Sequence, residues 1–179
     1  DELPGFVVQG PVIIRSEDQM AALSHAASGS PFSIDGHLTI EGTEVSSLRN
    51  LEHLTHINGN LNIRRTSIED LSGLENLTQV ARVVWIQQNP ALKSLEGLHR
   101  LEFVGWELNI SDNDALAQLQ GPRQLERVED SLTLAGNDGL TTLEGLNALE
   151  LIGGNLLIEG AIDGTVDINA DIAADGDVT

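Results

Sequence analysis

The sequence predicts a mostly-β fold, classed as α/β by convention: a right-handed solenoid of about six coils with one parallel sheet and an N-terminal capping helix. A tripeptide of the form apolar-x-apolar recurs every 23 or 24 residues. Further leucine, isoleucine and valine columns keep the same period, and the residues between them are rich in Gly, Asn, Asp and Ser, which favour turns. The tripeptides begin at Leu38, Leu61, Val84, Leu108, Leu132 and Leu156.

Each tripeptide is interpreted as a short strand whose first and third side chains point inward and whose middle side chain points outward. Copies that lie one coil apart run in the same direction, so they pair as a parallel sheet along one side of the solenoid. The predicted outward middle positions are Thr39, Asn62, Trp85, Asn109, Thr133 and Leu157.

The rest of each coil carries leucines at fixed offsets among Asn, Gly, Asp and Ser, and these small and polar residues favour turns and short irregular or 3₁₀ segments over full helices. A single coil would leave its apolar faces exposed, so stacking has to bury them. A polar column also follows the strands, and its recurring asparagines are predicted to hydrogen-bond to backbone groups of the turns and from coil to coil. Its members are Thr43, Thr66, Asn89, Asn113 and Asn137.

The chain ends differ from the repeats. Residues 6–14 have strand character with a break at Gly10-Pro11, and Ser16 with Gln19 fits a capping box that opens a helix over about 17–27. This helix is the predicted N-terminal lid.

The solenoid is therefore assigned to residues 1–160. In residues 161–179 apolar residues recur six apart, at Val166, Ile172 and Val178, which indicates a C-terminal cap or the start of a tighter β-helical segment. A change of coil type would fit a chain that is a fragment of a longer protein.

Charge and composition exclude several classes of function. The chain has 28 acidic and 9 basic residues, a formal net charge of −19 and no cysteine. This balance argues against nucleic-acid binding and excludes disulfides, and like-charge repulsion favours a monomer. Apolar runs fall short of the ~18 residues of a membrane span, so membrane insertion is not expected.

The sequence contains none of the motifs that mark common active sites. His53-x-x-His56 could place two imidazoles near a metal, but no third ligand converges with them. Asp167-Ile-Asn169-Ala-Asp171 begins like a calcium loop, yet Ile172 and Val178 stand where that loop needs Gly and Glu. No catalytic residue, cofactor or metal is expected.

Several units resemble those of receptor L domains, which are leucine-rich solenoids found in the ligand-binding parts of insulin- and EGF-type receptors and in bacterial surface proteins. The resemblance spans about residues 8–158. It rests on Ile57-Asn-Gly-Asn-Leu61-Asn-Ile63, on Val104-Gly-Trp-Glu-Leu108-Asn-Ile110-Ser-Asp-Asn113-Asp-Ala-Leu116, and on Leu95-Glu-Gly-Leu98 and Leu143-Glu-Gly-Leu146. Animal members use disulfides, which this chain lacks, so the resemblance implies a bacterial protein at the cell surface, in the periplasm or outside the cell.

The predicted function is a non-enzymatic recognition or adhesion module that binds protein or glycan on the parallel-sheet face. An aromatic side chain at an outward strand position is costly unless something covers it, which singles out Trp85. A structural spacer in a longer bacterial surface protein is the alternative, and a polysaccharide-active enzyme is a third, disfavoured one. The expected ligand-binding residues are Asn62, Arg64, Trp85, Gln87, Trp106 and Asn109.

Overall fold

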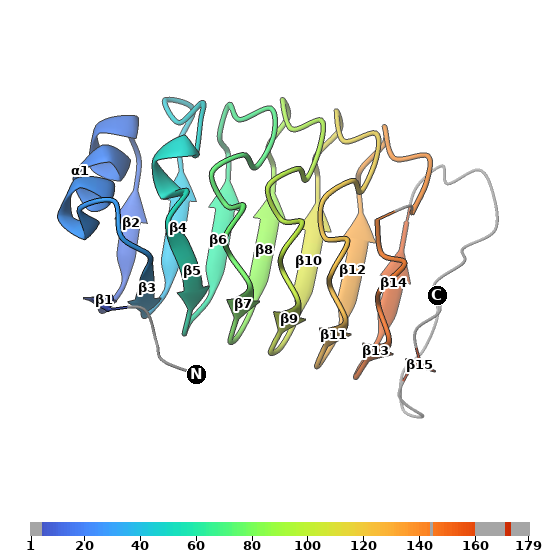
Figure 1. The fold of residues 1–179 in the computed structure, drawn as a ribbon. Helices are drawn as coiled ribbons and strands as arrows, with labels where there is room; N and C mark the ends of the chain where they lie inside the picture. The colour runs from blue at the N-terminus through green and yellow to red at the C-terminus, as the bar shows by residue number, and fades with distance from the viewer. Residues whose placement is uncertain (1–4, 144, 160–170, 173–179) are drawn as a thin grey trace.

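A computed structural model of the chain describes residues 5–143, 145–159 and 171–172. It confirms the predicted fold: coils stack side by side into a solenoid whose strands run in parallel (Figure 1). Each coil has three sides: a short strand, a second strand after a tight corner, and a longer loop. The loops line one side of the molecule, which we call the loop side.

The predicted tripeptides lie in the second strand of each coil, after the tight corner, and these strands form what we call sheet B. Their register aligns Leu38, Leu61, Val84 and Leu108 side by side, as the repeat predicted. Within the described residues sheet B has seven strands. They are β2 (Val12–Ile14), β4 (Leu38–Glu41), β6 (Leu61–Arg64), β8 (Val84–Gln87), β10 (Leu108–Ser111), β12 (Leu132–Ala135) and β14 (Leu156–Ile158).

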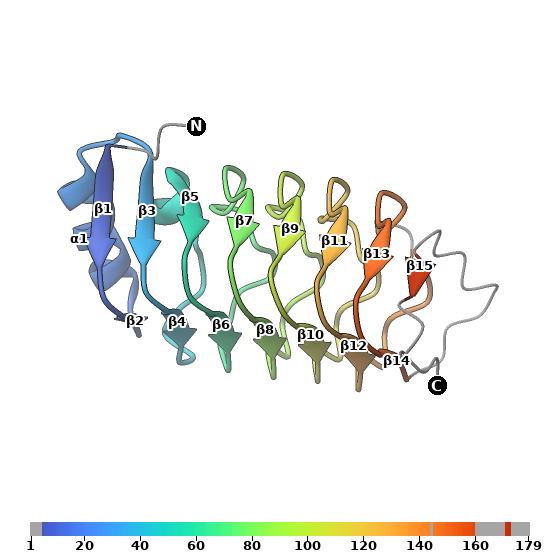
Figure 2. The ribbon, with the colours of Figure 1, turned by 90° about the horizontal axis from the view of Figure 1, so that it is seen from below.

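The prediction of one parallel sheet is wrong, because a second parallel sheet, sheet A, forms another side of the solenoid (Figure 2). From β7 onward its strands are only two residues long, too short to show the alternation by which a strand is detected in sequence. Among the described residues it contains eight strands. They are β1 (Phe6–Gln9), β3 (Phe32–Asp35), β5 (Leu54–Ile57), β7 (Gln79–Val80), β9 (Phe103–Val104), β11 (Arg127–Val128), β13 (Leu151–Ile152) and β15 (Asp171–Ile172).

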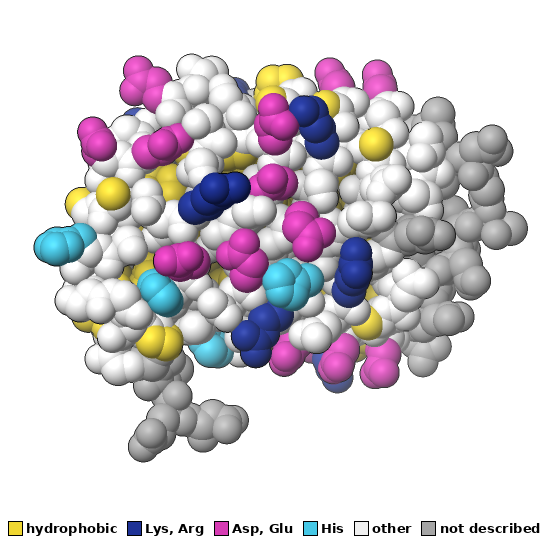
Figure 3. Space-filling view, turned by 45° about the horizontal axis from the view of Figure 1, so that its top comes forward, with side chains coloured by type: hydrophobic (Ala, Val, Ile, Leu, Met, Phe, Trp, Pro, Cys, Tyr) yellow, Lys and Arg dark blue, Asp and Glu magenta, His cyan; other side chains and the backbone are white. Residues whose placement is uncertain are grey.

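The loop side sends leucines into the core, where the leucine columns meet the inward residues of both sheets. A 3₁₀ helix, η1 (Arg49–Leu51), belongs to one of these loops. On the outside, acidic, basic and histidine side chains are interspersed on this side, with only scattered hydrophobic patches (Figure 3). The core therefore lies inside the coils, and the loop side is a mixed polar surface.

The asparagine column forms the coil-to-coil bonds predicted for it. The Oδ1 atom of Asn113 accepts the backbone N–H of Asn89 at 3.1 Å, and the Oδ1 atom of Asn137 accepts that of Asn113 at 3.1 Å. Thr66 joins through Oδ1 of Asn89. All four residues are buried, so the ladder satisfies backbone groups that water does not reach.

The N-terminal helix α1 (Glu17–Ala27) begins and ends where the sequence predicted. Ser16 caps it by accepting the N–H of Gln19, whereas the Gln19 side chain accepts the N–H of Arg15, one residue before the usual capping-box partner. The break at Gly10-Pro11 is the corner between β1 and β2, so these strands and α1 make up an additional first coil. The helix stands at the N-terminal end of the solenoid (Figure 1).

The predicted C-terminal segment, residues 161–179, lies outside the described residues except for β15. Here β15 pairs in parallel with β13 and adds a strand to sheet A. The prediction of a cap or a tighter β-helical segment stays a prediction, as does the boundary at residue 160.

Candidate functional site

The outward side chains of sheet B form one continuous surface, which we call the sheet-B face. Because successive side chains of a strand alternate between faces, every second residue lies on it. The register aligns its positions in columns across the strands. The middle column is Ile13, Thr39, Asn62, Trp85, Asn109, Thr133 and Leu157; the next column is Arg15, Glu41, Arg64, Gln87, Ser111, Ala135 and Glu159.

Trp85 lies at the centre of the sheet-B face. It sits on β8, between Asn62 of β6 and Asn109 of β10 in register. Its neighbours in the strand, Val84 and Ile86, point into the core and are fully buried, whereas Trp85 is 37% exposed. The strand alternation that buries the two aliphatic residues is thus what turns the indole outward.

A hydrogen-bonded network of five side chains fixes the surroundings of Trp85; we call it the Trp85 network. The indole Nε1–H donates to Oε2 of Glu107 at 3.3 Å, and Nδ2 of Asn109 donates to the other oxygen of Glu107 at 3.0 Å. Oδ1 of Asn109 accepts from Gln87 at 3.0 Å and from Ser111 at 2.8 Å. These bonds couple β8, β10 and the corner before β10, so the indole is held in one orientation.

Asn62 flanks Trp85 on the other side. Its Nδ2 atom donates to Oγ1 of Thr39 at 3.4 Å, and its Oδ1 atom is buried without a hydrogen-bond partner. A buried amide oxygen without a donor has lost its hydration without compensation. Asn62 therefore carries a buried amide oxygen whose hydrogen bonding is incomplete.

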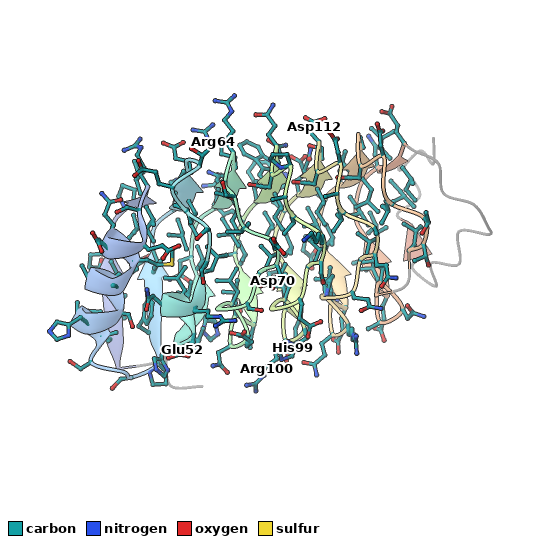
Figure 4. All side chains as sticks on the ribbon, turned by 90° about the horizontal axis from the view of Figure 1, so that it is seen from above. Glu52, Arg64, Asp70, His99, Arg100 and Asp112 are labelled. Carbon is teal, nitrogen blue, oxygen red and sulfur yellow. The ribbon has the colours of Figure 1, made fainter. Side chains whose placement is uncertain are left out.

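Two arginines and one glutamate occupy the N-terminal end of the face. Glu41 accepts from Nη2 of Arg15 at 2.6 Å and from Nη2 of Arg64 at 2.7 Å, one guanidinium on each carboxylate oxygen. Hydrogen bonds from Arg64 first and from Arg15 second lower the pKa of Glu41 from its ordinary value of 4.5. In Figure 4 Arg64 projects from the sheet-B side of the molecule, as does Asp112.

The structure brings five of the six predicted ligand-binding residues onto the sheet-B face, and Trp106 is the exception. Trp106 lies in the corner between β9 and β10 and is 47% exposed. The guanidinium carbon of Arg82 lies 5.3 Å from its ring centroid, which is cation–π geometry. Its prediction as a ligand contact stays a prediction.

Sequence reasoning did not single out Glu107, Glu41 or Arg15 as site residues. Glu107 and Glu41 occupy outward positions of the repeat, but nothing in the pattern distinguishes them from other surface acids. Arg15 could have been found by extending the outward columns to residues 12–15, which include the strand before the helix. This extension places Arg15 in the same column as Glu41, with which it forms an ion pair.

The two histidines of the His53-x-x-His56 pair belong to the other side of the molecule. His56 lies on β5 of sheet A, where Nδ1 is 3.0 Å from Oγ1 of Thr55 and Nε2 is 3.4 Å from Oγ1 of Thr78. His99, Glu52 and Arg100 also lie opposite the sheet-B face (Figure 4). Across the described ranges, no group of three or more histidines and carboxylates is arranged to hold a metal ion.

The fold defines the class of protein: a parallel-sheet solenoid of stacked, leucine-rich coils. A family model described as the Receptor L domain matches residues 32–124, which is just over half of the chain. The chain belongs to the receptor L domain family. Members of this family are non-enzymatic ligand-binding modules and are typically extracellular.

Two other comparisons add no relatives: neither the curated proteins nor the solved structures include a match to this chain. Among the residues described, no helix has the length and apolar character needed to cross a membrane.

Proposed function

We propose that this receptor L domain is a non-enzymatic recognition module that binds its ligand on the sheet-B face. The observation that carries the proposal is an exposed tryptophan, Trp85, held by the Trp85 network at the centre of a parallel sheet. An aromatic ring that is both exposed and fixed loses little conformational freedom when a ligand covers it. The predicted residues Asn62, Arg64, Gln87 and Asn109 surround it on the same face.

We place this module outside the cytoplasm of a bacterium, at the cell surface or in the periplasm. The family supports an extracellular setting, and the cysteine-free sequence needs no oxidative folding machinery. With a net charge of −19, copies of the chain repel one another, which supports a monomer.

The alternative function is a spacer in a longer surface protein. The observation that favours it is the pairing of β15 with β13, which adds a strand to sheet A beyond the last complete coil. A spacer does not need Trp85, so dependence of binding on this residue separates the two functions.

The test screens the wild-type protein against a displayed random peptide library and against an oligosaccharide array. Trp85→Ala should weaken the selected ligands at least ~10-fold, a loss of about 1.4 kcal/mol of binding free energy, with a melting temperature within a few degrees of wild type. Phe103→Ala is the matched control, because it removes an aromatic side chain that lies on sheet A and not on the sheet-B face.

Recognition on the sheet-B face would be refuted if no ligand of either class depended on Trp85. It would also be refuted if Phe103→Ala weakened every ligand as much as Trp85→Ala.

A further inference from the structure

Building on the proposed function, we infer that the ligand of the sheet-B face is a neutral glycan. One sugar ring stacks on the indole of Trp85, and the amides of Asn62, Gln87 and Asn109 on both sides bond to its hydroxyl groups. The size of the face, the arrangement of apolar groups and the charge each point to this class of ligand.

The sheet-B face is too small for a typical protein partner. Seven strands spaced ~4.8 Å apart give a length of roughly 29 Å. The width is roughly 14 Å when a third outward column is counted, formed by the residues two before the middle column, such as Val83 and Glu107. The product is about 400 Å², half of the ~800 Å² per partner that a standard protein interface buries. A short oligosaccharide in an extended form matches the long axis of such a strip.

The apolar groups of the face are arranged as for a sugar. Protein hot spots sit among several apolar groups that exclude water, whereas Trp85 has an asparagine on each side and one apolar neighbour two residues before it, the buried Val83. In its column the next large apolar side chains are Ile13 and Leu157, each three strands or ~14 Å away. A pyranose ring needs one aromatic plane for its C–H groups and hydrogen-bonding groups at its rim, and this face supplies both.

The unpartnered Oδ1 atom of Asn62 is a further acceptor for a sugar hydroxyl group. Rotation of this amide about its side-chain torsion would turn a buried acceptor toward the hydroxyl groups of a ligand stacked on Trp85. A hydroxyl donor from the ligand would then supply the hydrogen bond that the free protein lacks.

The charges near Trp85 favour a ligand without charge. The carboxylate of Glu107 accepts from the indole itself, so an anionic sugar placed on the ring would meet a negative charge at its edge. Glu41 is already bound by two guanidinium groups, and both oxygens of Glu107 are bonded within the Trp85 network. A cationic ligand would therefore meet a single unneutralised carboxylate beside the ring, that of Glu107, whose two oxygens already orient the indole and the Asn109 amide.

The experiment uses the 179-residue protein and named probes. The neutral probes are gluco-, manno-, xylo-, galacto- and N-acetylglucosamine oligosaccharides, and the acidic comparators are oligogalacturonate and heparin fragments. Binding is followed by intrinsic fluorescence in a Trp106→Phe background, where Trp85 is the remaining one of the two tryptophans. Calorimetry gives the affinity in 0.05 and 0.5 M NaCl.

At least one neutral series should bind with a change in Trp85 emission and an affinity that changes less than ~2-fold with salt, because no ion pair forms. Trp85→Ala should weaken the binding of this neutral oligosaccharide at least ~10-fold. Trp85→Tyr should retain most of the wild-type affinity, and Phe103→Ala should retain all of it.

Three results would overturn the inference. If no oligosaccharide binds, whereas peptides selected from the displayed library bind in a Trp85-dependent way, the assignment of a glycan is wrong and recognition on the sheet-B face stands. If only the acidic comparators bind, with a steep salt dependence, the ligand is anionic. If neither the oligosaccharides nor the displayed peptides bind in a Trp85-dependent way, the glycan and the proposed function fail together.

Discussion

Asn89, Asn113 and Asn137 show how single residues hold neighbouring coils together. Each amide reaches a backbone group of another coil: Nδ2 of Asn113 donates to the carbonyl of Ile86 at 2.9 Å, and that of Asn137 donates to the carbonyl of Ile110 at 2.8 Å. The sequence revealed this column because the residue type repeats with the coil.

Replacing Asn113 with alanine should lower the free energy of unfolding by about 3 kcal/mol, because the buried N–H of Asn89 and the carbonyl of Ile86 both lose their partner. The midpoint of urea unfolding measures the loss. The control is Asn109→Ala, on the surface of the same coil, where we expect less than about 1 kcal/mol. Equal losses for the two variants would show that the ladder contributes nothing beyond an ordinary surface network.

The pairing of Glu41 with Arg64 and Arg15 makes a prediction about pH. Its pKa in the folded protein is lowered, so its ionised form contributes stability above the ordinary pKa of 4.5, and this contribution is lost as the pH falls through the lowered value. In an NMR titration, Arg64→Gln should raise the pKa of Glu41 more than Arg15→Gln does, because the hydrogen bond from Arg64 is the larger cause. The opposite order would show that Arg15, and not Arg64, is the stronger partner of Glu41.

At the scale of elements, the tight turns of the loop side set how closely coils can stack. Gly97 has φ of +110°, and a Cβ at this position would collide with the carbonyl oxygen of Leu71 in the preceding coil. Gly73 and Gly145 hold equivalent turns at φ of +118°. Only glycine combines this backbone conformation with so close an approach.

Gly97→Ala should therefore destabilise the protein by at least about 2 kcal/mol, since it adds both backbone strain and a clash between coils. Thermal unfolding followed by circular dichroism measures the effect. Gly5→Ala is the control, because nothing lies within 4 Å of the added Cβ. A melting temperature unchanged from wild type would mean that neighbouring coils can move apart at little cost.

The elements also show where sequence reasoning reached its limit. The strands of sheet B and helix α1 were predictable, because apolar alternation and a capping box are local signals. For the later strands of sheet A, such as β7 with Val80, the sequence shows only an apolar column with the period of the coil. Two residues are enough for pairing once the neighbouring coil has set their position, but they are too few for a periodicity.

At the scale of the whole molecule, the charge of −19 acts against the compact state. Like charges repel across a small surface, and salt screens them over a Debye length of about 8 Å at physiological ionic strength. The few ion pairs of the described chain, such as Lys93 with Glu69, leave most acidic side chains without a basic neighbour to offset this repulsion.

Raising NaCl from 0.01 to 0.5 M should therefore raise the melting temperature by several degrees, since screening relieves repulsion more than it weakens the exposed ion pairs. Light scattering at both salt concentrations should report a monomer of 19.1 kDa. A melting temperature that fell with salt would show that ion pairs outweigh repulsion, and a dimer would refute the proposed monomer.

The sequence by itself determined the period, the inward columns, the asparagine ladder, helix α1 and the membership of Trp85 in an outward column. It could do so because a solenoid repeats the same local environment in every coil, so each column is visible as a recurrence along the chain. The tertiary structure alone decided that Glu107 holds the indole of Trp85, that Arg15 and Arg64 share Glu41, and that Trp106 turns toward Arg82 at the corner. These contacts join single side chains that occur once each, and which of them meet depends on register and rotamer rather than on any pattern that repeats.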